Sequence, residues 1–301
     1  MSAGVVEIGW IELVCAAGFM IVAALISWKF ELGQTKNIAV STLRCFLQLL
    51  ACGFLLGYLF QLQTWWLVIV VLLCMVAAAT QIATSRVKNS VRGLRIPVFA
   101  SILLSSLAVL FIVVDGVVHA DPWYNAREVI PIAGMIIGNA MSSTAVAIDR
   151  LFNDMDARQD EIFSLVALGA TPREAAYPSI KASIGAGMTP TLATMSAAGI
   201  VSIPGMMTGQ VLAGADPLAA AKYQILMLMV ITAANAITIM MACFLTYKKR
   251  FAEKGYYLEK VCADKHHRSS LGTRRRRCRL IRKATARFAG YALCCDVSLL
   301  N

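Results

Sequence analysis

Charged residues are scarce in this sequence. They make up 15% of its 301 residues, whereas hydrophobic residues make up 58% and the mean hydropathy is +0.69. Soluble domains usually contain about 45 to 50% apolar residues. The composition therefore excludes an ordinary soluble protein and indicates an integral membrane protein.

Recognisable patterns for metal ions, disulfides and nucleotides are missing as well. The chain has three histidines, and its nine cysteines form no C-x-x-C pair, which is typical of reduced thiols. No G-x-x-x-x-G-K-[ST] loop occurs, and there is no Gly-Lys dipeptide at all. Because that loop is what cradles nucleotide phosphates, we expect this chain to bind no ATP and no other cofactor by itself.

Apolar stretches long enough to cross a bilayer are what the sequence does contain. A spanning helix needs about 20 residues to cover roughly 30 Å of hydrocarbon at 1.5 Å per residue. The predicted fold is all-α, a polytopic membrane protein with about seven transmembrane helices in a domain of residues 1–247. The expected spans are 8–28, 38–60, 65–85, 96–116, 129–149, 182–203 and 219–247.

The basic residues between these spans predict the orientation. If the N-terminus lies outside, 25 Lys and Arg fall in the inner segments, and the outer segments contain only Arg127 and Lys222. This asymmetry follows the positive-inside rule and predicts a cytoplasmic C-terminus. Residues 150–181, which include the unusually polar "LVALGATPREAAYPSIKASI", then face the cytoplasm.

The segment 158–181 has the local chemistry of a helical elbow. Gly169 is a natural stop for a helix over 158–168, and Thr171, Pro172 and Glu174 predict an N-cap, a first helical residue and a capping box. Pro178 is expected to bend the chain into the span that begins near Ala182. Such an elbow suits the transmission of motion from a cytoplasmic partner. One alternative is an amphipathic loop that lies on the lipid headgroups. Another is a helix-turn-helix that reads DNA, although its second helix would carry few basic residues.

Polar residues inside the spans are candidates for a translocation pathway because burying them in lipid is costly. Arg44 and Gln48 share one face of their helix, although Arg44 is close enough to the inner end to snorkel to the headgroups. Asn139 and Ser142 share a face of the fifth span with Ser143. That span also contains a G-x-x-x-G pair that favours close helix packing, so Asn139 either lines a pathway or bonds across helices.

The stretch "SIPGMMTGQVLAGADP", residues 202–217, interrupts the apolar pattern. Its proline and glycines are expected to break any continuous helix. Non-helical backbone near the membrane is tolerated where it lines a cavity or is buried in protein. Asp216 is expected to cap the final helix. Met206 and Met207 could offer thioether ligands to a metal or simply fill gaps. The candidate pathway residues are Arg44, Gln48, Asn139, Ser142, Pro204, Gly205, Met206 and Met207.

Five stretches carry a resemblance to a known family. They are "LGATPREA", "VIPIAGMIIGNAM", "AAGIVSIPGMMTG", "LAGADPLAAAKYQI" and "FLTYKKRF". Together they resemble the FetB-type family of ABC exporter permeases, which includes a bacterial iron-export permease and, more distantly, plant membrane proteins of aluminium tolerance. The likeness covers roughly residues 8–251.

The resemblance implies a permease subunit of the inner (plasma) membrane that is not itself an enzyme. ATP and Mg²⁺ would bind to a separate cytoplasmic ABC ATPase, and two permeases would pair with two ATPases. The implied cargo is a metal ion, with iron first. The implied contact with the ATPase consists of Glu161, Leu168, Gly169, Ala170, Thr171, Pro172 and Arg173.

The chain continues for about 50 residues after "YKKRF", where members of that family usually end. The segment 248–301 contains 15 Lys and Arg against 4 Asp and Glu, and we interpret it as a disordered, basic cytoplasmic tail. It could also bind anionic lipid or nucleic acid without specificity. The rival functions are an ion-coupled secondary transporter, which needs ionisable groups deep in the spans, and a non-transporting membrane anchor that uses this tail.

Overall fold

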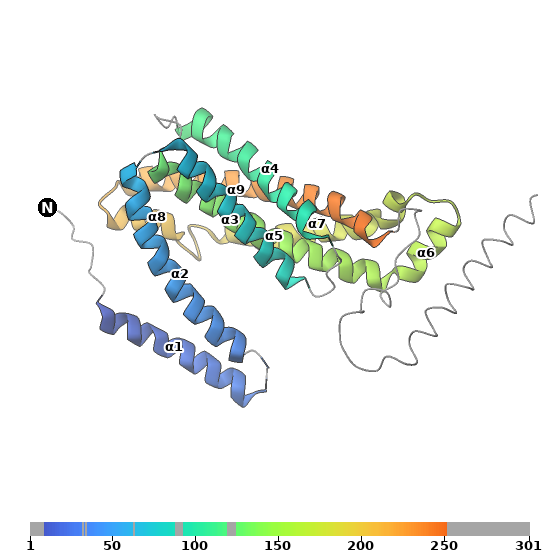
Figure 1. Ribbon diagram of the computed structural model, residues 1–301, viewed down its shortest axis with the longest axis horizontal. Coiled ribbons are helices and arrows are strands. Elements are labelled where there is room, and N and C mark those ends of the chain that lie inside the picture. Colours follow the sequence, from blue (N-terminus) through green and yellow to red (C-terminus); the bar gives the residue numbers. More distant parts are fainter. Residues whose placement is uncertain are drawn as a thin grey trace, which may run out of the picture. The chain divides into compact units, whose positions relative to one another are not determined.

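The chain folds almost entirely into helices over the residues that the structure describes. The computed structural model describes residues 9–31, 33, 35–62, 64–87, 93–118 and 125–251 (Figure 1). Within these ranges no β-strand is present, and an isolated bridge joins Ala198 and Ser202. The predicted all-α class is therefore confirmed. The predicted tail lies, from residue 252 on, outside the described residues.

The helices follow the predicted spans closely in order and position. They are α1 (Trp10–Lys29), α2 (Thr35–Leu62), α3 (Trp65–Arg86), α4 (Arg95–Val113), which continues as the π-helix η1 (Val114–Val118), α5 (Ala126–Ala157), α6 (Gln159–Ala167), α7 (Pro172–Ala197), α8 (Gly205–Leu212), α9 (Pro217–Thr246) and the 3-10 turn η2 (Tyr247–Arg250). Six of the predicted spans match one of these helices closely, whereas the sixth, 182–203, is displaced, because α7 begins at Pro172 and ends at Ala197.

Five of those helices are long and apolar enough to cross a membrane. They are α2, α3, α4, α5 and α9, whereas the apolar part of α1, Ala16–Lys29, is shorter. The helix α7 has sufficient length, but it carries Lys181 and several small polar residues in its first half. The structure thus supports a polytopic membrane protein, while the count of seven spans and the orientation stay predictions.

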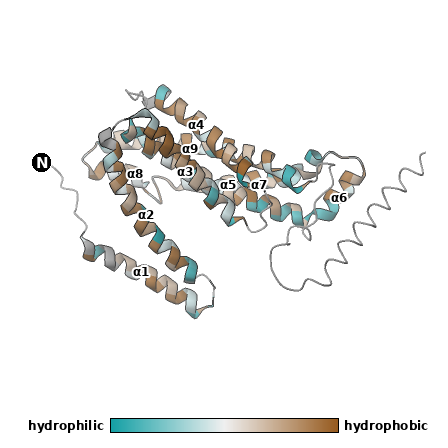
Figure 2. Ribbon diagram, viewed as in Figure 1, coloured by the Kyte–Doolittle hydropathy of each residue, from teal (hydrophilic) through white to brown (hydrophobic). Residues whose placement is uncertain are grey.

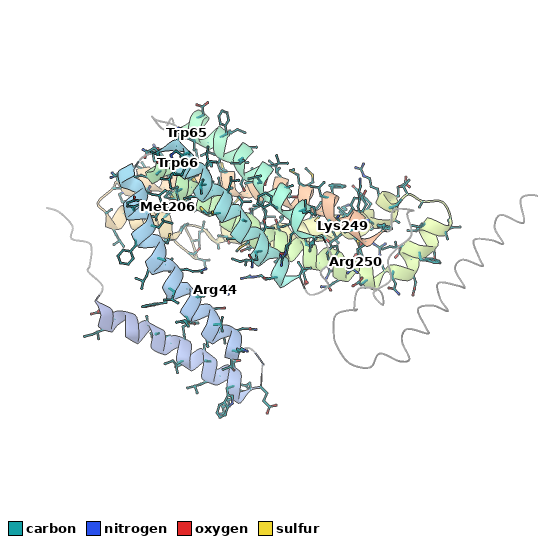
Figure 3. The ribbon with its side chains drawn as sticks, in the orientation of Figure 1. Arg44, Trp65, Trp66, Met206, Lys249 and Arg250 are labelled. Atoms are coloured by element: carbon teal, nitrogen blue, oxygen red, sulfur yellow. The ribbon has the colours of Figure 1, made fainter. Side chains whose placement is uncertain are left out.

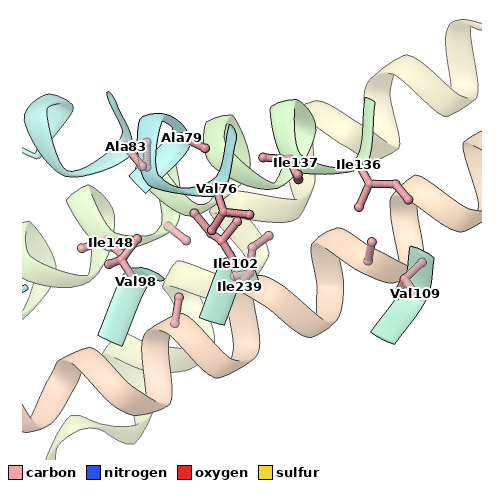
Figure 4. Packing of buried hydrophobic residues seen from close by; sticks show 14 of the residues in the cluster. Val76, Ala79, Ala83, Val98, Ile102, Val109, Ile136, Ile137, Ile148 and Ile239 are labelled. Carbon is pink, nitrogen blue, oxygen red and sulfur yellow. The ribbon is translucent and has the colours of Figure 1, made fainter. Parts of the chain in front are cut away.

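The core forms around α5, which contacts α3, α4, α7 and α9. The side chains of Val76, Ile102, Ile136 and Ile239, from α3, α4, α5 and α9, are almost completely buried in one continuous cluster (Figure 4). Helices α1 and α2 contact each other, and most of their apolar side chains are exposed. In a bilayer such exposed apolar side chains face lipid, so their exposure carries no free-energy penalty.

Two turns at the end of α7 and before α9 carry the predicted helix breaks. Gly199 and Gly214 adopt φ of 83° and 91°, a left-handed conformation that glycine tolerates best. Asp216 caps α9, since its Oδ2 accepts a hydrogen bond from the N–H of Ala219 at 3.0 Å. Residues 202–217 form no continuous helix, as predicted, and between the breaks Gly205–Leu212 form the short helix α8.

Candidate functional site

The elbow between α6 and α7 is closed by two helix-capping motifs. At the end of α6, the N–H of Ala170 donates to the carbonyl of Leu165 at 3.0 Å and that of Gly169 to the carbonyl of Val166 at 3.1 Å. This pair of bonds is a Schellman motif, and it requires the φ of 97° that Gly169 adopts. The predicted stop at Gly169 is confirmed.

The start of α7 is a complete capping box, also as predicted. The hydroxyl of Thr171 accepts from the N–H of Glu174 at 3.3 Å, while the Glu174 carboxylate accepts from the N–H of Thr171 at 2.8 Å. Pro172 is the first helical residue. The turn between α6 and α7 is therefore tight because both helix ends satisfy their own backbone groups locally.

Pro178 does not separate the elbow from the span that follows it. The helix α7 continues without interruption from Pro172 to Ala197, with Pro178 inside it. The side chains of Ala175, Ala176, Ser179 and Ile180 on either side of the proline are buried. This packing holds the helical conformation through a residue that lacks an N–H. The elbow is thus directly continuous with a membrane-length helix.

Arg158 joins the elbow to the helices on either side of it. Its guanidinium donates to the Glu161 carboxylate at 2.6 and 2.9 Å, to the hydroxyl of Ser179 on α7 at 3.2 Å, and lies 3.9 Å from Asp154 on α5. The hydrogen bond from Arg158 lowers the pKa of Glu161. Glu161, a predicted contact residue, therefore also fixes α6 to its surroundings.

Two apolar side chains of the elbow are left without cover. Leu168 is 86% exposed and Phe163 is 65% exposed, whereas Ile162 of the same helix is completely buried. Figure 2 shows hydrophilic residues gathered around α6 and the adjoining end of α5. The two side chains are therefore candidates for a contact with a partner. Leu168 was predicted, but Phe163 was missed, although its place beside Ile162 in "DEIFSLVALG" was visible in the sequence.

The end of the last helix is fastened to α5 and α7. The side chain of Arg250 is 3% exposed; its Nη2 lies 3.1 Å from Asp156 Oδ2, and its guanidinium carbon lies 4.8 Å from the centre of the Phe152 ring. Arg173, at the start of α7, lies 5.3 Å from the centre of the Phe244 ring. We call the group of Arg250, Asp156 and Phe152 the Arg250 clamp; Figure 3 labels its arginine. It was missed because Arg250 was assigned to the tail.

A correction to the predicted domain boundary follows. The permease domain was expected to end at residue 247, with a disordered tail from 248 onward. The structure buries Arg250 and Phe251 against the helices, so the folded part extends at least to residue 251.

The eight predicted pathway residues do not form one cluster. Arg44 and Gln48 are exposed on α2, and Asn139 and Ser142 are exposed on α5. Pro204 caps α8, Gly205 is its first residue, and Met206 and Met207 are half-buried in its first turn. Among the described residues, no hydrogen bond links any two of the eight, and no group of three His, Cys, Asp or Glu could hold a metal ion.

A buried polar seam crosses the helices instead. The carboxamide of Asn235 on α9 donates to the hydroxyl of Thr191 on α7 at 2.8 Å, which lies 3.3 Å from the hydroxyl of Ser143 on α5. Ser105 on α4 is 2.6 Å from Thr238 on α9. Hydrogen bonds of this kind join helices in apolar surroundings. Of these residues only Ser143 was noted in the sequence, because single polar residues in apolar runs do not reveal their partners.

Comparison with known proteins gives one family over most of the chain. The profile described as "Uncharacterised protein family (UPF0014)" matches residues 10–251. The UPF0014 membrane protein YjkA of Bacillus subtilis is 35% identical over 77% of this chain and 92% of its own. The probable iron export permease protein FetB of Escherichia coli is 33% identical over 79% and 90%.

A plant protein matches over a similar length. The protein ALUMINUM SENSITIVE 3 of Arabidopsis thaliana is 30% identical over 83% of this chain and 90% of its own. No solved structure matches the chain.

Proposed function

Since this chain belongs to the UPF0014 family, we propose that it is the membrane-spanning permease subunit of an ABC exporter, with a metal ion, and iron first, as its cargo. The name of the Escherichia coli relative supports the cargo. The chain is a multi-pass helical membrane protein, and it contains no phosphate-binding loop of its own. The energy would come from ATP and Mg²⁺ on a separate cytoplasmic ATPase, and two permeases would pair with two ATPases.

The observation that carries the proposal is the construction of the elbow. It presents Leu168 and Phe163 to the outside, while its own backbone groups are satisfied by the two capping motifs. An apolar side chain on a rigid support is what a docking contact requires, because little conformational entropy is lost on binding. Leu168 to Arg173 would form the contact with the ATPase, and Glu161 would hold α6 in place.

Motion of the elbow has three routes into the helices. The helix α7 continues from it without a break, Arg158 links it to α5 and α7, and Arg173 contacts Phe244 of α9. Closure of the ATPases would therefore move α5, α7 and α9 together. Alternating access would follow if this shift exposed the polar face of α5, with Asn139 and Ser142, to one side of the membrane and then to the other.

The remaining pathway candidates belong to this proposal as well. Arg44 and Gln48 on α2 are exposed, and so is Gly205 at the start of α8, whereas Pro204, Met206 and Met207 are half-buried. A second permease or the cargo could meet these positions. The methionine thioethers are soft ligands, whereas ferrous iron favours harder nitrogen and oxygen donors. Iron as the cargo therefore rests on the relative's name and not on these residues.

The test is reconstitution with and without an ATPase. The purified chain is placed in proteoliposomes together with a cognate ATPase, and transport of Fe²⁺ and ATP hydrolysis are both followed. We expect the Leu168→Asp variant to lose stimulation of hydrolysis and transport together. The control is Ser85→Asp, which adds the same charge to an exposed position at the end of α3 and is expected to leave both activities intact.

Two outcomes would favour the rival functions. Uphill transport by the chain alone, driven by an ion gradient, would show a secondary transporter. Loss of cellular activity on deletion of residues 252–301, together with a silent Leu168→Asp variant, would show a membrane anchor that acts through its tail.

A further inference from the structure

A groove of about 310 Å³ opens between α3 and α4, and the proposed transport mechanism does not use it. Its lining residues are Ala77, Thr80, Gln81, Arg95, Ile96 and Phe99. The hydroxyl of Thr80 already donates to the carbonyl of Val76 at 2.8 Å. The polar groups left to meet a ligand are Gln81 and the guanidinium of Arg95, while the rest of the wall is apolar. We call this feature the α3–α4 groove.

The groove begins at the membrane boundary and extends into the apolar layer. Arg95 is the first residue of α4, and no charged residue follows it until Asp115. Ala77 lies nine residues before the end of α3 at Arg86, which is about 13 Å along a helix. A ligand that fills the groove therefore needs a polar group at the Arg95 end and an apolar part along Ala77, Ile96 and Phe99.

The polar end of the groove is positively charged. The ammonium nitrogen of Lys249 would lie 3.6 Å from a Cβ placed on Gly93, two residues before Arg95, and Figure 3 shows Lys249 next to Arg250. Among the described residues, no acidic side chain lines the groove. A guanidinium at the end of the groove, with an ammonium beside the turn that precedes it, favours a phosphate, which Arg can bind through two hydrogen bonds.

We propose that the α3–α4 groove binds one anionic phospholipid. Its phosphate lies against Arg95 and Lys249, and one acyl chain lies over Ala77, Ile96 and Phe99. The volume is at the lower end of the 300 to 1,000 Å³ typical of ligand pockets, so the groove accommodates a headgroup and the first part of one chain. The remainder of the lipid stays in the bilayer.

Photolabelling tests the proposal without any ATPase, so the result is independent of the proposed transport function. The full chain is placed in phosphatidylcholine nanodiscs with a small fraction of phosphatidylglycerol that carries a diazirine on an acyl chain. We expect labels on α3 and on the first turns of α4. Arg95→Gln should reduce this labelling about fivefold, as expected for one lost cation near anionic lipid, and Arg95→Lys should restore part of it.

Matched variants distinguish labelling that depends on the groove from labelling that depends on the basic charge of the protein in general. Arg150→Gln removes the same charge from an exposed position on α5 and should leave the labelling unchanged. Ala77→Trp fills the groove and should abolish the labelling, whereas Ala78→Trp places the same bulk at the next exposed residue, outside the lining, and should not. If Ala77→Trp does not fold, the comparison of Arg95→Gln with Arg95→Lys tests the proposal.

Three results would overturn the proposal. The first is labelling that is unchanged in both Arg95→Gln and Ala77→Trp. The second is complete displacement of the lipid by inorganic phosphate, which would indicate a site for the headgroup alone. The third is an unlabelled wild type whose Ala77→Cys variant forms a cross-link between two copies, which would show that a second chain covers the groove.

Discussion

Among the described glycines, Gly187 on α7 makes the closest approach to neighbouring helices. A Cβ at this position would lie 2.8 Å from Ala147 Cβ, 3.1 Å from the carbonyl oxygen of Ser143 and 3.1 Å from Ile239 Cδ1. Two of these atoms belong to α5 and one to α9. The absence of a side chain at residue 187 is therefore what allows α7 to approach both helices.

Substitution of this glycine should be costly. We expect Gly187→Ala to lower the free energy of unfolding by about 1 to 3 kcal/mol, the usual cost of overpacking. The control is Gly185→Ala on the same helix, where a new Cβ meets nothing within 4 Å and helix propensity gains up to about 1 kcal/mol. Unfolding midpoints of the two variants in detergent compare them directly, and equal midpoints would contradict the packing argument.

The G-x-x-x-G pair that the sequence singled out does not make this contact within the chain. A Cβ at Gly138 meets nothing within 4 Å, and one at Gly134 meets only Met75 Cε at 3.4 Å. A pair of glycines shows that a helix can be approached closely. Which helix approaches is decided by the packing of several helices, and a sequence pattern within one helix does not contain that information.

The carboxylate of Glu174 has its pKa lowered by the backbone N–H of Thr171 and then by the Thr171 hydroxyl. Its stabilising effect on the start of α7 is therefore fully present above the ordinary value of 4.5 and is lost as the pH falls through the lower folded value. We expect Thr171→Ala to raise the pKa of Glu174 only part of the way back, because the N–H remains. NMR titration of the carboxyl carbon measures this, and a wild-type Glu174 that titrates at 4.5 would refute the capping box.

The capping motifs and the proline of α7 show which parts of an element can be predicted. Gly169, Thr171 and Glu174 act on their immediate neighbours, so their spacing in the sequence was sufficient to place the turn. Pro178 acts locally too, but buried residues on both sides of it keep the helix intact. Tertiary packing outweighed the local preference, and sequence spacing does not show how strong that packing is.

The Arg250 clamp joins two elements through a buried charge. Removing one partner of a buried ion pair typically costs about 3 kcal/mol or more, since the other charge stays in an apolar environment. We expect Arg250→Gln to lose about that much stability and Arg250→Gln with Asp156→Asn to lose less than the sum of the two single variants. Chemical unfolding of the four proteins of this cycle measures the coupling.

The neighbouring lysine provides the control. Lys249 is exposed, and Lys249→Gln should leave the stability within about 0.5 kcal/mol of the wild type. The sequence "YKKRF" contains three adjacent cations and does not reveal which one turns inward. The 3-10 turn η2 at the end of α9 decides this, and its tighter winding could not be read from composition.

At the scale of the whole molecule, the family match and the packing both extend beyond residue 247, at least as far as residue 251. The profile matches residues 10–251, and Phe251 is buried, with its ring centre 6.4 Å from that of Tyr247 in an edge-to-face arrangement. Hydropathy alone placed the boundary at residue 247 because it registers the end of the apolar run. Hydropathy does not detect a basic turn that packs against the helices.

Two truncations test this boundary. A chain that ends after Phe251 keeps Tyr247, Arg250 and Phe251, and we expect its unfolding midpoint in detergent to equal that of the full chain. A chain that ends after Thr246 loses all three buried side chains together with the partner of Asp156, so we expect a markedly lower midpoint or aggregation on gel filtration. Equal stability of the two truncated chains would mean that η2 contributes nothing to the fold and that residue 247 is its true end.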